Sequence, residues 1–72
     1  MKLADEVRIV RKKAFLTQDE FAAKLSVASN TVNRWESGKS KPNITAMKKL
    51  VVFCKEHNID SETLENSWVV EV

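Results

Sequence analysis

The segment from Thr17 to Pro42 constrains the fold of this chain more than any other part of it. Thr17 and Glu20 have the spacing of a capping box, which starts a helix by pairing each of the two side chains with a backbone N–H of the other residue. Apolar residues at helical spacing then predict two short amphipathic helices, over residues 18–25 and 29–36. Two helices joined by three residues cross at an angle, as they do in a helix-turn-helix.

Further helices are predicted on both sides of this pair. Apolar residues recur with a helical period before Thr17 and again after Pro42, and Asn43 and Asp60 are residue types that cap the N-termini of helices. The expected helices cover residues 2–14, 18–25, 29–36, 44–57 and 61–66. Residues 67–72 are rich in β-branched and aromatic side chains, which predicts a short strand or a loose tail that either folds back on the core or pairs with another copy.

The charge of the chain is divided unevenly along its length. Its 72 residues include 12 Lys and Arg and 10 Asp and Glu, for a net charge of +2. Residues 1–55 hold all 12 basic residues and five acidic ones, for +7, whereas residues 56–72 hold five acidic residues and no Lys or Arg, for −5. A basic body favours a polyanionic partner such as nucleic acid. The alternative is a solvated surface of mixed charge.

The residue types argue against a metal site, against enzymatic activity and against a membrane-spanning segment. The chain has a single cysteine, Cys54, and a single histidine, His57, so we expect neither an internal disulfide nor a metal site. There is no nucleophile–base spacing and no phosphate-binding glycine loop, so we expect no enzymatic activity and no cofactor. The N-terminus has no apolar leader and no apolar run is long enough to span a bilayer. We therefore expect one small cytoplasmic domain.

The expected helix over residues 29–36 has the dimensions of a DNA-reading element. A major groove about 12 Å wide admits one α-helix, and side chains on its outer face then reach base edges. Asn pairs well with adenine and Arg with guanine. The base-contacting candidates are Ser29, Asn30, Asn33 and Arg34. Gln18, at the start of the preceding helix, and Lys39 and Lys41, in the following loop, are candidates for contacts with DNA phosphates.

The residues from Leu16 to Ala22, together with those from Val32 to Lys39 and Pro42, resemble the Cro/C1-type (Xre-like) helix-turn-helix family of repressors. The resemblance covers roughly residues 3–66. It implies an all-α, five-helix, lambda-repressor-like domain over residues 1–66 that binds operator DNA, usually as a dimer, with residues 67–72 as a C-terminal tail. Matched position by position, it also implies the base-contacting and phosphate-contacting roles given above. It implies a structural ion pair between Arg11 and Glu36.

The chain departs from the family pattern at three places. Ser26 replaces the glycine usual in the turn and must then adopt a left-handed conformation, at a cost of about 1 kcal/mol. Ala28 stands where the family has a capping Ser or Thr, so that either the cap is missing or Ser29 supplies it. The helix over residues 44–57 is about three residues longer than is usual, which puts a family-like dimer contact in question.

Together these features predict a sequence-specific regulator of transcription, a repressor, that binds double-stranded DNA without enzymatic activity. The alternative is an antitoxin-type protein-interaction module, in which the same fold binds a protein partner through the acidic segment after residue 55. For the DNA-binding function, the family resemblance implies a homodimer as one possible partner, besides the double-stranded DNA.

Overall fold

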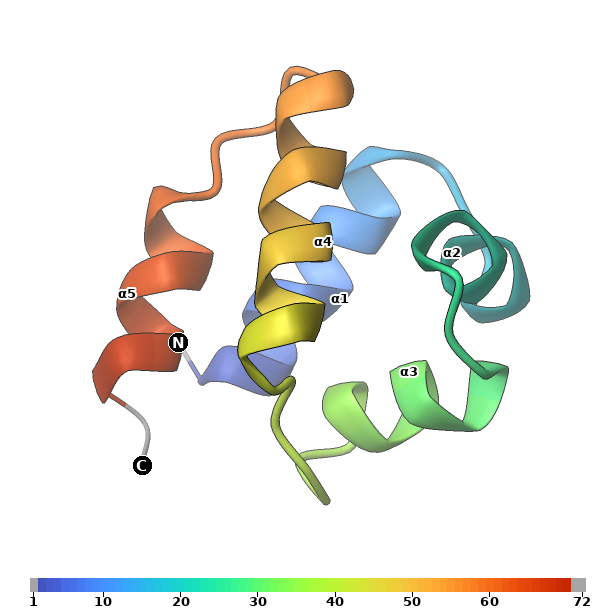
Figure 1. Ribbon diagram of the computed structural model, residues 1–72, viewed down its shortest axis with the longest axis horizontal. Helices are drawn as coiled ribbons and strands as arrows, with labels where there is room; N and C mark the ends of the chain where they lie inside the picture. Colours follow the sequence, from blue (N-terminus) through green and yellow to red (C-terminus); the bar gives the residue numbers. More distant parts are fainter. Residues whose placement is uncertain (1, 71–72) are drawn as a thin grey trace.

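The computed structural model describes residues 2–70, and it contains five helices and no strand within this range. The helices are α1 (Leu3–Lys13), α2 (Gln18–Leu25), α3 (Ser29–Glu36), α4 (Ile44–Glu56) and α5 (Glu62–Val70). Figure 1 shows α3 at the lower edge of the molecule, with α2 above one of its ends and the α3–α4 loop beyond the other. The predicted all-α architecture of five helices is confirmed.

The start of α2 has the predicted capping box. The Thr17 hydroxyl accepts a hydrogen bond from the Glu20 backbone N–H at 3.1 Å, and the Thr17 N–H donates to Glu20 Oε1 at 2.9 Å. At the other end of α2, Ser26 has φ 57° and ψ 43°, which is the left-handed conformation predicted for a residue in the place of glycine. The chain therefore turns sharply there and enters α3 after Val27 and Ala28.

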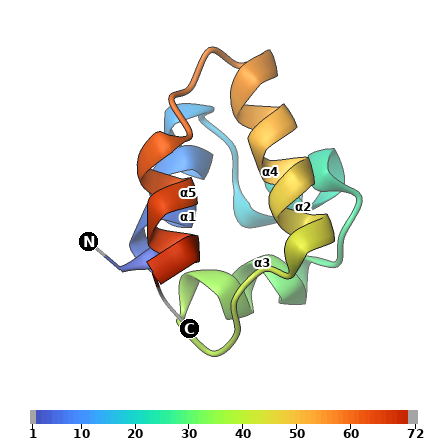
Figure 2. The same ribbon diagram turned by 60° about the vertical axis from the view of Figure 1, so that its left-hand side comes forward.

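One apolar core joins all five helices, and every helix contributes at least one fully buried side chain to it. Phe21 of α2 packs edge-on against Phe53 of α4, with ring centroids 5.0 Å apart and planes at 75°, a favourable geometry for aromatic pairs. Trp35 and Cys54, on the apolar faces of α3 and α4, are both buried in it. The turned view in Figure 2 shows α5 alongside α1, and these two helices are in contact.

The helix boundaries differ from the predicted ones mainly at the C-terminus. Helices α2 and α3 have the predicted bounds, α1 is one residue shorter than predicted at each end, and α4 is one residue shorter at its C-terminus. The last helix was predicted to end at residue 66, but α5 continues to Val70, so that residues 67–70 are helical instead of a strand or a loose tail. The reason is packing: Trp68 lies partly buried against the core, which outweighs the strand preference of the neighbouring valines. Residues 71–72 lie outside the described range.

No helix within residues 2–70 is long and apolar enough to cross a membrane. Over the same range there is no group of three or more His, Cys, Asp or Glu side chains with the arrangement to hold a metal ion.

Candidate nucleic-acid interface

The outer face of α3 is polar and exposed. Ser29, Asn30, Asn33 and Arg34 all lie on it in contact with solvent, whereas Val32, Trp35 and Glu36 face the interior. Ala28 is the N-cap residue of α3 and no side chain caps the helix, so the Ser29 hydroxyl is not used as a cap. The four predicted base-contacting residues therefore share one solvent-facing surface on a helix whose opposite face is held in the core.

Glu36, at the end of α3, is a buried carboxylate bound by two arginines of α1. Arg11 donates from Nε to Glu36 Oε2 at 2.8 Å and from Nη2 to Oε1 at 2.9 Å, a bidentate ion pair. Arg8 donates from Nη2 to the Glu36 backbone oxygen at 3.1 Å, and its Nε lies 3.6 Å from Oε1. Arg11 Nη1 also donates to the Leu16 carbonyl oxygen at 3.0 Å. Arg11 thus joins α1, the start of α2 and the end of α3.

The pKa values of both partners are shifted in the direction that keeps them charged. Burial opposes the ionisation of Glu36, but the hydrogen bonds from Arg11 and Gln18 and the charges of Arg11 and Arg8 outweigh it, so that the pKa of Glu36 is lowered. The hydrogen bond to Glu36 raises the pKa of Arg11. The carboxylate therefore accepts hydrogen bonds and donates none.

Gln18 connects this ion pair to the exposed face of α3. Its Nε2 donates to Glu36 Oε1 at 3.3 Å, and its Oε1 accepts a hydrogen bond from Asn33 Nδ2 at 3.3 Å. Because an ionised carboxylate only accepts, the NH₂ group of Gln18 faces Glu36 and its oxygen faces Asn33. The NH₂ group of Asn33 must then face Gln18, since the reverse orientation would bring two acceptor oxygens together. The amide of Asn33 is therefore oriented by a chain of contacts that begins at Arg11.

The loop after α3 holds the two predicted phosphate-contacting lysines, and they differ in their surroundings. Gly38 has φ 78°, and the backbone N–H groups of Lys39 and Ser40 both donate to the Arg34 carbonyl oxygen, at 3.0 and 3.4 Å. Lys39 is exposed. Lys41 instead contacts α5: its ammonium group donates to the Trp68 carbonyl oxygen at 3.2 Å and lies 4.8 Å from the centroid of the indole ring.

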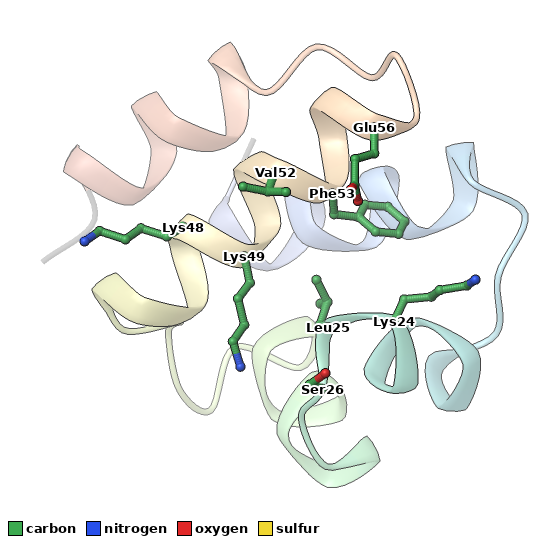
Figure 3. A pocket seen from close by; sticks show the side chains of 8 residues that line it. All are labelled: Lys24, Leu25, Ser26, Lys48, Lys49, Val52, Phe53 and Glu56. Carbon is green, nitrogen blue, oxygen red and sulfur yellow. The ribbon is translucent and has the colours of Figure 1, made fainter.

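A separate hollow lies between α2 and α4, away from the outer face of α3. Its floor is apolar, from Leu25, Val52 and Phe53, and Lys24 and Lys49 stand on its rim. Figure 3 shows Lys49 extending from α4 toward the α2–α3 turn, whereas Lys24 points away from the hollow. None of the predicted DNA-contacting residues lines this hollow, so it is not part of the candidate interface.

The structure brings several of the predicted site residues into contact, and it adds two that the sequence did not single out. Gln18 and Asn33 are hydrogen-bonded to each other. Arg8 was not predicted to contact Glu36, although its position one helical turn before Arg11 places both arginines on one face of α1. Trp68 was assigned to a tail, and no sequence signal linked it to the loop at Lys41.

Comparisons with known proteins agree on one family. The model of the helix-turn-helix family matches residues 7–57, a range that includes α2, α3 and the loop after α3. The chain is also 32% identical over 53 residues to the HTH-type transcriptional activator BcrR of Enterococcus faecalis. The alignment covers 74% of this chain and 26% of the activator, so the chain spans about a quarter of that relative's length. No solved structure matches the chain significantly.

Proposed function

The chain belongs to the Cro/C1-type helix-turn-helix family, and on this basis we propose that it is a sequence-specific regulator of transcription that binds double-stranded DNA. In this proposal α3 enters the major groove and its outer face reads the bases. Family membership supports the DNA-binding part, and the similarity to a transcriptional activator supports the regulatory part. The function is binding and requires no catalysis.

The observation that carries the base-reading proposal is the orientation of the Asn33 amide. An asparagine recognises adenine by accepting from N6 with its oxygen and donating to N7 with one of its two N–H groups. In the free protein the other N–H group already bonds to Gln18 at 3.3 Å. The oxygen and one N–H therefore remain for a base, in an orientation that is set before DNA arrives. Ordering this side chain in advance reduces the entropic cost of binding.

Arg34, Ser29 and Asn30 complete the proposed reading surface. Arg34 is exposed beside Asn33, and its planar guanidinium matches O6 and N7 of guanine. Ser29 and Asn30 lie in the first turn of α3, the part of a recognition helix that reaches base edges in this class of protein. We expect these four residues to decide which sequence is bound.

The phosphate contacts are proposed for Gln18, Lys39 and Lys41. Such contacts set the register of the protein on the duplex and supply affinity that depends on salt concentration. Lys39 is exposed on the loop that follows α3. For Lys41, a phosphate contact would compete with its present contacts to α5, so Lys39 is the stronger candidate.

Single substitutions separate base reading from phosphate binding. Arg34→Ala should cost about 1–3 kcal/mol on the preferred duplex and relax the preference at one base position. Lys39→Ala should weaken binding to all sequences alike and reduce the slope of log affinity against log salt by about 1. Lys55→Ala, which removes the same charge at the end of α4, is the matched control. Equal, sequence-independent losses for Arg34→Ala and Lys39→Ala would contradict the assignment of Arg34 to base reading.

The sign of regulation is part of the proposal. The family resemblance favours a repressor, whereas the similar E. faecalis protein is named an activator. A reporter gene behind the selected operator, measured with and without the protein, distinguishes the two: we expect expression to fall when the protein is present.

Assembly of two copies is proposed for the same function. Ile44, Val51 and Val69 line an apolar groove between α4 and α5, and Val69 is 71% exposed. Two copies would read half-sites about 34 Å apart, one turn of DNA. Sedimentation of the protein over a range of concentrations tests for the dimer.

The antitoxin-type alternative uses the acidic segment that follows residue 55. Its acidic side chains Glu56, Asp60, Glu62 and Glu65 are all exposed, and Glu65 lines the apolar groove. A stable complex with a protein partner that is lost when these charges are reversed, together with no enrichment of any duplex sequence, would favour this alternative.

A further inference from the structure

Trp68 of α5 contacts the loop after α3. The indole N–H of Trp68 donates to the carbonyl oxygen of Pro42 at 2.6 Å. The side chain of Pro42 is itself fully buried. Asn43, the next residue, caps α4 by accepting a hydrogen bond from the Ala46 N–H at 2.8 Å. The second half of this loop is thus held by α5 on one side and by α4 on the other.

The loop also donates a hydrogen bond to α5. Lys41 donates to the carbonyl oxygen of Trp68 at 3.2 Å, and its ammonium group lies 4.8 Å from the indole centroid. Trp68 is in the last turn of α5, where carbonyl groups lack partners within the helix and the helix dipole favours a cation. The indole face attracts a cation as well. Trp68 and Lys41 therefore bind each other through a ring, a carbonyl and an ammonium group.

The first half of the loop is attached to the DNA-reading helix. The N–H groups of Lys39 and Ser40 donate to the carbonyl of Arg34, one of the proposed base-reading residues. The backbone of residues 39–42 therefore connects Lys39 and Ser40, which are bonded to the end of α3, with Lys41 and Pro42, which are bonded to Trp68 of α5.

We propose that Trp68 is a positioning residue for DNA binding, which holds the loop of residues 37–43 so that Lys39 is presented to a phosphate. This inference rests on the proposed DNA-binding function. Trp68 itself contacts no DNA; it acts through the carbonyl of Pro42 and the ammonium of Lys41. Tryptophan suits this role because it combines an N–H donor with a large ring. Phenylalanine retains a ring but cannot donate a hydrogen bond to Pro42.

The experiment compares Trp68→Phe with wild type in salt-dependent binding to a labelled non-specific duplex. At a temperature where both proteins are fully folded, Trp68→Phe should bind between about threefold and tenfold more weakly, and its slope of log affinity against log salt should be smaller by up to about 1. Asn66→Ala is the matched control, because Asn66 is exposed on the same helix but lies outside the apolar groove and has no hydrogen bond to the loop among the contacts of residues 2–70. It should leave both quantities unchanged.

A double-mutant cycle with Lys39→Gln separates positioning from a general loss of stability. If Trp68 acts through Lys39, the Trp68→Phe substitution should change affinity by less than about twofold once Lys39 has been replaced, because the two effects are not additive for coupled residues. A purely structural role for Trp68 would lower the melting temperature and leave the salt slope of the folded protein unchanged, and that result would overturn the proposal. Additive effects of the two substitutions would overturn it too.

The wild-type protein supplies a second test if Trp68→Phe does not fold. The indole N–H of Trp68 should exchange with solvent more slowly when duplex DNA is bound, because Lys39 on phosphate stabilises the same loop conformation. Unchanged exchange on saturation with duplex would contradict the proposal. If wild type shows no salt-dependent binding to any duplex, the proposed DNA-binding function itself fails. If wild type binds and Trp68→Phe binds equally well, only the positioning role of Trp68 fails.

Discussion

Replacing Arg11 by leucine should destabilise the fold more than any exposed substitution, because it leaves the Glu36 carboxylate buried without its main partner. The Glu36 side chain is only 1% exposed, and Arg11 supplies both short hydrogen bonds to it, at 2.8 and 2.9 Å. Removal of one member of a buried pair costs about 3–5 kcal/mol. Arg8 and Gln18 remain near the carboxylate, so we expect the lower end of that range, about 3 kcal/mol.

This loss is large for a small domain. The stability of a domain of this length is on the order of 4–11 kcal/mol, so that about 3 kcal/mol is a substantial fraction of it. The melting temperature, followed by circular dichroism at neutral pH, should fall by about 12–24 °C. The double substitution Arg11→Leu/Glu36→Leu removes both charges, and it should recover at least about 2 kcal/mol relative to Arg11→Leu alone.

The pH dependence of stability supplies a second readout of the same prediction. In wild type the pKa of Glu36 is lowered from 4.5. Its ionised form therefore stabilises the fold above pH 4.5, and this contribution is lost as the pH falls through the lower folded-state pKa. In Arg11→Leu, burial dominates and should raise the folded-state pKa of Glu36. That variant should become more stable as the pH falls from 7 toward 5, where wild type does not. A loss below about 1 kcal/mol, or a double variant no more stable than the sum of the single effects, would refute the reasoning.

Three further predictions follow from local features of the structure. Phe15 has φ 58° and is 93% exposed, and Ser26 has φ 57°. Because glycine adopts this left-handed conformation without strain, Phe15→Gly and Ser26→Gly should each raise the free energy of unfolding by about 1 kcal/mol in urea titrations. Lower stability of both variants would show that neither backbone is strained. Burial raises the pKa of the Cys54 thiol to about 11. Iodoacetamide should therefore alkylate the folded protein at pH 7 far more slowly than the urea-unfolded protein. Equal rates of alkylation would contradict the burial of Cys54. Gln18→Leu should weaken the base preference at the position read by Asn33, measured by selection from random duplexes; a loss of affinity that is equal for all sequences would assign Gln18 to phosphate binding alone.

The helix-turn-helix could be predicted from the sequence because its signals are local. The capping box at Thr17 depends on residues three positions apart. The left-handed conformation of Ser26 was predicted from the family resemblance, in which a glycine usually occupies this place in the turn. These features need no knowledge of distant packing. The predicted bounds of α2 and α3 match the structure for this reason.

The features that could not be predicted depend on contacts between distant residues or on conformations that the side chain disfavours. Trp68 meets Pro42 across 26 positions of the chain, and nothing near Trp68 in the sequence indicates that contact. The end of α5 was misassigned because Val69 and Val70 favour strands locally, whereas packing of the helix decides the outcome. The left-handed Phe15 is exposed and non-glycine, a combination that no pattern in the chain predicts.

The sequence predicted which residues form the candidate site, but not the hydrogen bonds that join them. The polar outer face of α3 follows from helical spacing, because Val32 and Trp35 fix which side faces the core. The bond between Gln18 and Asn33 does not follow from spacing, since it depends on how α2 and α3 cross. The roles of these residues toward DNA stay predictions.

The central claim is that α3 reads base sequence, and selection from a random pool of duplexes tests it most directly. Wild type is compared with the double variant Asn33→Ala/Arg34→Ala, whose changes lie on the exposed face of α3 and should leave the melting temperature within a few degrees of wild type. We predict that wild type enriches a defined motif and that the folded double variant binds duplexes weakly and enriches none. The same motif from both proteins, or no motif from wild type, would contradict the claim that this face of α3 recognises DNA sequence.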